Sequence, residues 1–179
     1  MAHLLFHRSD RPRAGRACRH AGNSRISTQN HGAGMKPQQY PRSPKILLGG
    51  MAHLGRLIDK IRMRHAGQIQ DYNYLTTGFD KYLIELLGIA PDELERRVLS
   101  ARSDDDIVSW IRAHGYTLSD EDLRQWNARI LEAGPKDDAA RRRFEDRLAG
   151  IAGKRGVRVE DLPRATTWVD CIELDEDRM

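Results

Sequence analysis

Helix start and stop signals recur at short intervals from residue 43 onward, and they constrain the fold more than any other feature. Proline and serine favour first turns, because proline has no N–H to leave unpaired and a serine oxygen accepts from a free backbone N–H. Glycine favours helix ends, since a left-handed backbone costs it little. The start signals are Ser43–Pro44, Pro91, Ser103, Ser119 and Asp137, and the stop signals are Gly67, Gly88, Gly115, Gly134–Pro135, Gly153 and Gly156.

Apolar residues between these signals recur with the period of a helix that is buried on one face. The predicted stripes are Leu47, Met51, Leu54, Ile58 and Ile61, then Phe79, Tyr82, Leu83 and Leu86, then Leu94 and Val98, and finally Ala140, Phe144, Leu148 and Ile151. A short helix is expected at Thr167–Leu174. We therefore predict an all-α fold, a compact single-domain bundle of about six helices over residues 35–179. Residues 68–76 form one short extended segment or an ordered loop.

Two segments, which begin at Ser103 and Ser119, repeat the same pattern. Each has an aspartate three residues after the serine, an aliphatic residue at the next position, and then a tryptophan, Trp110 or Trp126. The serine and aspartate predict a capping box at the start of each helix. Because the two tryptophans occupy equivalent positions, we expect both to be largely buried.

Basic charge is concentrated in the first 34 residues. The whole chain carries +4 and has a pI of about 9.3, but these residues hold six arginines and one aspartate, a charge of +5, so residues 35–179 carry −1. We expect a disordered basic extension, since it has too little apolar periodicity to offset its ordering entropy. It is a transit peptide, a nucleic-acid-binding arm, or a segment foreign to the natural protein. We favour the last, with translation beginning at Met35.

The near-neutral charge of residues 35–179 argues against a nucleic-acid partner, since phosphate neutralisation dominates that affinity. No run approaches the ~18 apolar residues of a membrane span, so we expect no membrane association. Only two cysteines occur, Cys18 and Cys171, which favours a reducing compartment and a soluble cytoplasmic protein. Metal-binding and nucleotide-binding motifs are absent, so we expect no metal and no cofactor. The last ten residues hold five acids and are expected to be solvated.

The best candidate site lies on the first predicted helix. His53, Arg56, Lys60 and Arg64 fall within roughly an 80° arc at about 100° per residue. Their donors suit a phosphate or carboxylate group, whereas the alternative interpretation is a solvated charged face balanced by Asp59. The ligand-binding candidates are His53, Arg56, Lys60, Tyr72, Tyr74, Trp126 and Asn127.

Several spaced segments carry a resemblance to a known family. They are PRSP (41–44), LGGMAHLGRLIDKIR (48–62), Tyr72-Asn73-Tyr74, FDKYLIELLGI (79–89), and Trp126-Asn127 before Gly134-Pro135. Over about residues 38–175 the chain resembles a small bacterial family catalogued as domain of unknown function 5069. The resemblance implies a compact, mostly helical cytoplasmic protein, and it brings no established activity or functional residues. The sequence of residues 74–77 departs from the family's usual loop.

Two classes of function follow. The first is a binding or interaction protein that holds a small anionic ligand or a protein partner on the His53, Arg56 and Lys60 flank. The alternative is an enzyme in which His53 is a general base oriented by Asp59 or Asp71, because histidine titrates near neutral pH. The oligomeric state stays open in both cases.

We predict that a chain beginning at Met35 folds and melts like the full-length chain, since the first 34 residues carry little that a core could use. Thermal unfolding followed by circular dichroism compares the two chains directly. A markedly lower melting temperature for the shorter chain would show that the extension is part of the folded structure.

Overall fold

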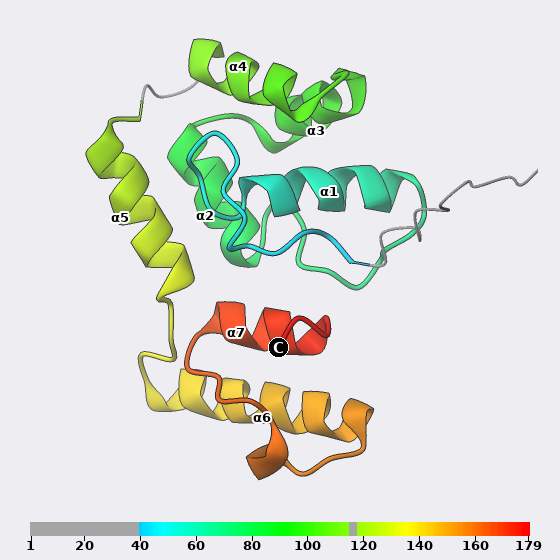
Figure 1. Ribbon diagram of the computed structural model, residues 1–179. Helices are drawn as coiled ribbons and strands as arrows, with labels where there is room; N and C mark the ends of the chain where they lie inside the picture. The colour runs from blue at the N-terminus through cyan, green and yellow to red at the C-terminus, as the bar shows by residue number, and fades with distance from the viewer. Residues whose placement is uncertain (1–39, 115–117) are drawn as a thin grey trace, which may run out of the picture. The chain divides into compact units, whose positions relative to one another are not determined.

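Seven α-helices and one 3₁₀ helix form the regular structure of residues 40–114 and 118–179, which are the residues that the computed structural model describes. These residues belong to one compact unit, Lys36–Met179. In chain order the elements are α1 (Leu54–His65), α2 (Gly78–Leu87), α3 (Pro91–Ser100), α4 (Asp104–His114), α5 (Asp120–Leu131), α6 (Asp138–Arg155), η1 (Val159–Asp161) and α7 (Trp168–Asp175) (Figure 1). The described residues contain no strand, and 68–77 form a loop. The all-α prediction is confirmed, while the predicted extension 1–34 and the predicted helix stop at Gly115 lie outside the described residues.

Side-chain caps start the later helices where the sequence predicts them. The Ser119 hydroxyl accepts from the Asp122 backbone N–H, and the Asp122 carboxylate accepts from the Ser119 backbone N–H, which makes a capping box. Thr167 and Asp170 form a second capping box at α7. A side-chain oxygen at this position satisfies a backbone N–H that the helix itself leaves unpaired. These local interactions explain why the sequence located most helix starts correctly.

The two equivalent tryptophans differ in their burial. Trp126 is 3% exposed, so the prediction that it is largely buried is confirmed. Trp110 is only partly buried, and its ring stacks on His114 at 5.4 Å. The repeated sequence pattern therefore produces two similar helices in unequal environments.

The first helix begins at Leu54, so the prediction that Pro44 is its first residue is wrong. Ser43 forms a turn instead, in which the Lys45 N–H donates to the Ser43 hydroxyl at 3.0 Å. Gly49 and Gly50 then adopt left-handed φ angles of 59° and 87°, which an α-helix cannot accommodate. Leu47, predicted to be buried on a helix face, is 51% exposed in consequence.

The buried face of α2 is shifted by one position from the predicted stripe. Its buried residues are Asp80, Leu83, Ile84 and Leu87, whereas Tyr82 is 41% exposed. The shift places Asp80 inside, where it pairs with His53 and Lys60. An apolar pattern alone does not predict an inward carboxylate, because an isolated buried charge is costly.

The core consists of a large and a small hydrophobic cluster. The large one is centred on α1, where Leu54, Leu57, Ile58 and Ile61 are fully buried, and α3 packs along this helix. The small one lies between α6 and α7 and includes Phe144. Helix α7 contributes to both clusters, since its Val169 belongs to the first. This arrangement brings the C-terminal end of the chain against the helices at its beginning.

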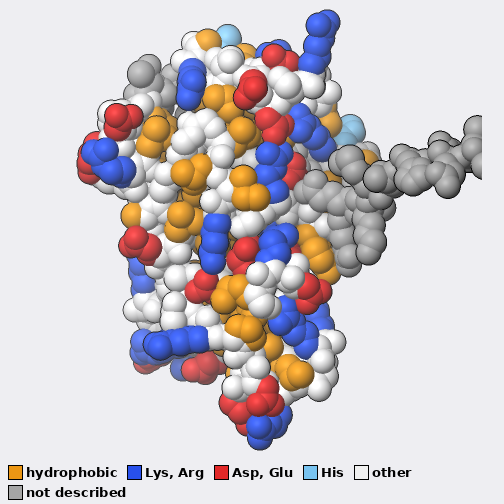
Figure 2. Space-filling view, viewed as in Figure 1, with side chains coloured by type: hydrophobic (Ala, Val, Ile, Leu, Met, Phe, Trp, Pro, Cys, Tyr) orange, Lys and Arg blue, Asp and Glu red, His pale blue; other side chains and the backbone are white. Residues whose placement is uncertain are grey.

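Positive and negative side chains alternate over the face drawn in Figure 2, without a large area of either sign. This distribution agrees with the near-neutral charge of residues 35–179. In the part of the chain that the structure describes, no helix has the length and apolar character that a membrane crossing needs.

The left-handed turn before α1 allows a matched test with two glycines. We predict that Gly49→Ala destabilises the fold by about 1–3 kcal/mol, because its φ is 59° and the added Cβ would lie 2.8 Å from Val108 Cγ1. Gly150→Ala is the control, since this glycine lies within α6 and its Cβ would meet nothing within 4 Å. Chemical denaturation should show Gly150→Ala to be neutral or more stable, by up to about 1 kcal/mol. Equal effects at both positions would contradict this account of the turn.

Candidate functional site

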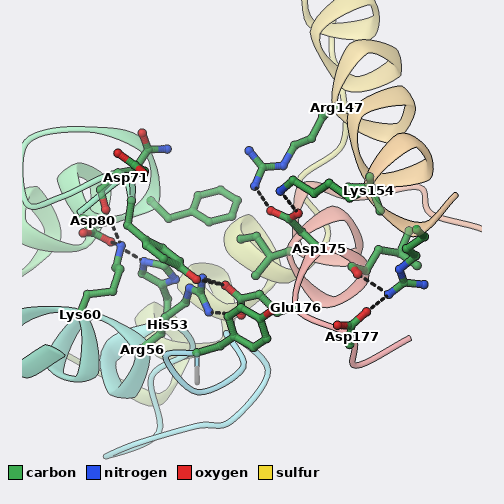
Figure 3. Close-up of a pocket in the computed structure, with 18 residues that line it drawn as sticks. His53, Arg56, Lys60, Asp71, Asp80, Arg147, Lys154, Asp175, Glu176 and Asp177 are labelled. Atoms are coloured by element: carbon green, nitrogen blue, oxygen red, sulfur yellow. Dashed lines mark hydrogen bonds and ion pairs between the residues drawn. The ribbon is translucent and has the colours of Figure 1, made fainter. Parts of the chain in front are cut away.

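A cavity of about 440 Å³ lies between two walls that come from opposite ends of the chain. One wall consists of α1, the 68–77 loop and α2, and the other consists of α6, α7 and the residues after α7. Its charged lining residues are Arg56, Lys60, Asp71, Asp80, Arg147, Lys154, Arg155, Asp175, Glu176 and Asp177. Figure 3 shows Arg147 and Lys154 approaching from the wall opposite His53, Lys60 and Asp80. The site is therefore polar and depends on the tertiary structure.

His53 occupies the turn before α1 and is buried, with 2% of its surface exposed. Its Nε2 lies 2.7 Å from Asp80 Oδ1. Burial lowers the pKa of His53 to about 4, the charge of Lys60 acts in the same direction, and the hydrogen bond with Asp80 opposes them. The ring is thus neutral at pH 7, and Nε2–H donates to the Asp80 carboxylate.

The second ring nitrogen of His53 is unpaired. Nδ1 is buried and has no hydrogen-bond partner among the described residues. With the proton on Nε2, Nδ1 carries a lone pair that can accept a hydrogen bond or a proton. A buried polar atom without a partner costs roughly 1–3 kcal/mol, and such atoms are uncommon in native proteins. Nδ1 is therefore a hydrogen-bond acceptor that the described residues leave unused.

Asp80 is the carboxylate that orients His53, and sequence reasoning missed it. Its Oδ1 accepts from His53 Nε2 and Lys60 Nζ, and its Oδ2 accepts from the Leu75 N–H at 3.1 Å. Burial alone would raise the pKa of Asp80, but the hydrogen bond with His53 and the charge of Lys60 hold it below its usual range. Asp80 stays ionised, and burial lowers the pKa of Lys60, with Asp80 opposing.

The two carboxylates that the sequence assigned to His53 have other places. Asp59 accepts hydrogen bonds from the Arg42 side chain at 2.7 and 2.6 Å, and from the Arg42 N–H. Asp71 lines the cavity, on the 68–77 loop. The structure thus gives the orienting hydrogen bond to Asp80 instead. The sequence signal for Asp80 is a single acid in the first turn of a helix, where a solvated acid is also favourable.

Arg56 is engaged in a buried ion pair with Glu176 and is not free to bind a ligand. Its Nη1 and Nη2 donate to the two Glu176 oxygens at 2.9 and 2.5 Å, and Nη1 also lies 3.2 Å from the Pro41 carbonyl oxygen. Tyr72 donates to Glu176 at 3.1 Å. Burial, with the charge of Glu176, raises the pKa of Tyr72 above its usual range, so the phenol stays protonated. Glu176 is 5% exposed, so the prediction of a solvated acidic end is wrong for this residue.

The predicted flank of α1 divides into an inner and an outer part. His53, Arg56 and Lys60 are each at most 3% exposed, which contradicts the interpretation of this flank as a solvated charged face. Arg64 lies outside the cavity, with its guanidinium 4.6 Å from the centre of the Tyr74 ring. Tyr74 is also outside, and its hydroxyl donates to Glu95 at 2.5 Å.

Trp126 and Asn127 do not line the cavity but hold the turn that carries His53. Trp126 Nε1 donates to the Ala52 carbonyl at 3.0 Å. Asn127 accepts from the Ala52 N–H at 2.7 Å and donates to the Gly50 carbonyl at 2.9 Å. Three hydrogen bonds from α5 thus support a turn in which His53 has a left-handed φ of 70°. For a residue other than glycine this conformation costs about 1–3 kcal/mol, so α5 acts as the scaffold of His53.

The opposite wall supplies cations that sequence reasoning also missed. Arg147 Nη2 and Lys154 Nζ lie 3.3 and 2.7 Å from the two oxygens of Asp175. Two positive charges therefore share one carboxylate at the rim. The sequence evidence for Arg147 and Lys154 was the spacing of basic residues along α6. Only the fold brings that face of the helix toward His53. Among the described residues, no group of three His, Cys, Asp or Glu side chains is placed to hold a metal ion.

The residues that line the cavity extend from Tyr40 to Asp177, almost the same range that matches one protein family. Residues 38–178 match the family described as a domain of unknown function (DUF5069), and the chain belongs to this family. A comparison with curated proteins finds no match.

The buried imidazole predicts a particular pH dependence of stability. Between pH 6.5, the ordinary pKa of histidine, and about 4, the pKa of His53 in the fold, only the unfolded chain takes up this proton. Stability therefore falls as the pH falls through this window, by roughly 3 kcal/mol from this group. Denaturation of the protein and of His53→Gln across pH 4–7 should show a flatter profile for the variant. Parallel profiles would contradict the assignment of a neutral buried His53.

Proposed function

We propose that this protein binds a small anionic molecule in the cavity, and that a donor group of this molecule bonds to His53 Nδ1. The observation that carries the proposal is the unpaired Nδ1, which lies buried in a cavity-lining ring. The strained turn beneath it supports the proposal, since unfavourable backbone conformations cluster at ligand-binding and active sites. A bound hydroxyl or amine would satisfy the nitrogen that the protein leaves unpaired.

The charges of the cavity indicate where the anionic group lies. Arg56 and Lys60 are already neutralised by the buried carboxylates Glu176 and Asp80. Displacing either carboxylate would leave it buried without its partner, which is costly. Arg147 and Lys154 instead share Asp175, so one positive charge is in excess within this group, although the charged lining of the whole cavity balances at five basic and five acidic residues. We therefore place the anionic group on α6 and not on the α1 flank.

A small molecule suits the cavity better than a protein partner does. His53, Arg56 and Lys60 are each at most 3% exposed, which is too little surface for a docking interface. The volume of about 440 Å³ falls within the range of pockets that hold small ligands, about 300–1,000 Å³. The mixed walls, with aromatic and charged side chains, also resemble a small-molecule site.

Catalysis by His53 is the second candidate function. The hydrogen bond between Asp80 and His53 Nε2 makes Nδ1 the ring nitrogen that can accept a proton. The Asp80 carboxylate also stabilises the imidazolium that results. A pKa of about 4 makes His53 a weak base in the empty cavity. A substrate anion nearby would raise this pKa by favouring the charged imidazolium.

We also propose that the protein acts in the cytoplasm, which the state of Cys171 supports. This thiol is free and fully buried between α6 and α7. Burial raises the pKa of Cys171 to about 11, so the thiol stays protonated and unreactive at pH 7. It packs as a small apolar side chain, as expected of a protein that does not rely on disulfides.

Ligand-induced thermal stabilisation tests the proposed function. We predict that at least one anion from orthophosphate, sulfate, acetate and citrate raises the melting temperature. At one hundred times its Kd, the ligand adds about 2.7 kcal/mol to the free energy of unfolding. An Arg147→Gln/Lys154→Gln variant should lose this effect because the excess charge is gone. Lys81→Gln is the matched control, since this exposed lysine of α2 pairs with Glu85 outside the cavity and should leave the effect unchanged.

The same measurement separates the outcomes. The proposed anion site is wrong if no anion shifts the melting temperature. It is also wrong if Arg147→Gln/Lys154→Gln shows the same shift as the unsubstituted protein. With a ligand in hand, His53→Gln distinguishes binding from catalysis. A purely binding role predicts weaker affinity and no product in either protein, whereas a catalytic role predicts turnover that His53→Gln abolishes.

A further inference from the structure

A second cavity, of about 350 Å³, adjoins the first. The two share four lining residues, Asn73, Phe79, Arg147 and Ile172. Helix α2 and Asn73 of the 68–77 loop line one side of it, and α6 and α7 line the other. Because the cavities have common walls, a ligand of moderate size bound in one can extend into the other.

Aromatic residues form a larger share of the lining in the second cavity, three of eight residues, than in the first, where Tyr40, Tyr72 and Phe79 are three of eighteen. Phe79, Tyr82 and Trp168 all contribute rings. The Tyr82 ring is held by Arg129, whose guanidinium lies 4.9 Å from the ring centre. The Trp168 ring is held by an edge contact with Phe144, with the ring centres 5.2 Å apart. Supported rings of this kind can pack on a flat ligand with little further ordering cost.

The charge of the second cavity is positive and is not balanced within its own lining. Arg143 and Arg147 lie one helical turn apart on α6, and both line it. In the described part of the chain, no acidic residue lines this cavity. The carboxylate that pairs with Arg147 is Asp175, at 3.3 Å, which Lys154 also contacts. An arginine beside aromatic rings suits an anionic group attached to a flat ring, since guanidinium binds such groups through paired N–H donors.

We infer that the ligand is an aromatic or heteroaromatic molecule with an anionic substituent, whose ring occupies the second cavity and whose anionic group lies at Arg147, which lines both cavities. The inference rests on the proposed function, which places the anionic group of the ligand on α6 and its hydrogen-bond donor at His53 Nδ1. It adds where the ring of the same molecule lies. It also accounts for the exposure of Tyr82, which is 41% exposed on a helix whose other large apolar residues are mostly covered. Tyr82 is the ring-binding residue, and Arg147 belongs to both cavities.

Two phosphate monoesters that differ only in the ring test the inference. Methyl phosphate and phenyl phosphate are titrated into the full-length protein by calorimetry at one pH and one salt concentration. Phenyl phosphate should bind about three- to tenfold more tightly, as expected of one added aromatic contact. Tyr82→Ala should remove most of this preference and leave the Kd of methyl phosphate unchanged, and Tyr82→Phe should retain the preference. Leu99→Ala, which changes an exposed side chain outside both cavities, is the control.

The outcomes distinguish this inference from the proposed function. If methyl phosphate binds and phenyl phosphate binds no more tightly, the assignment of the second cavity is wrong while the anion site stands. A preference that persists in Tyr82→Ala also overturns the assignment. If neither monoester binds, the inference is overturned as well, and the thermal measurements with the other anions then decide separately whether the first cavity is a binding site.

Discussion

The buried guanidinium of Arg56 connects three segments that are far apart in the sequence. It donates to the carbonyl oxygens of Pro41 and Arg42 before α1, and to both oxygens of Glu176 after α7. Removing an arginine and a carboxylate from water costs several kcal/mol for each ion, so each requires its partner and further hydrogen bonds. Tyr72 and Arg178 complete the coordination of Glu176. The C-terminal segment is thereby held against α1, and residues of both line the cavity.

A second set of interactions holds His53 in a conformation that its own residue type disfavours. The left-handed turn follows two glycines with positive φ, and α5 supports it through Trp126 and Asn127. Neither side chain lines the cavity, yet both hold the backbone that precedes His53. Packing and hydrogen bonds of this kind restrict a functional group to one geometry before any ligand arrives. The indole and amide groups that resembled ligand contacts in the sequence are therefore positioning groups.

The distribution of charge also separates structural ions from available ones. Buried carboxylates neutralise the cations of the α1 flank, and they do so at distances that leave no room for an external anion. The cations of α6 are different, because they are more exposed and outnumber the carboxylate that they share. Binding energy is gained most readily where a charge is not already satisfied. The candidate site thus follows from the pairing of charges and not from their number.

Helix capping, glycine stops and apolar periodicity were sufficient to predict an all-α fold and most helix boundaries, because each depends on residues within one or two turns of each other. The same local signals failed at Ser43–Pro44, where left-handed glycines that follow redirect the chain. They also failed at α2, where Asp80 turns inward to meet His53 and Lys60. His53, Lys60 and Tyr72 could be selected from the sequence, but Asp80, Glu176, Arg147 and Lys154 could not. Their roles depend on partners between 20 and 120 residues away, and a buried charge is stable only where the folded chain supplies its partner.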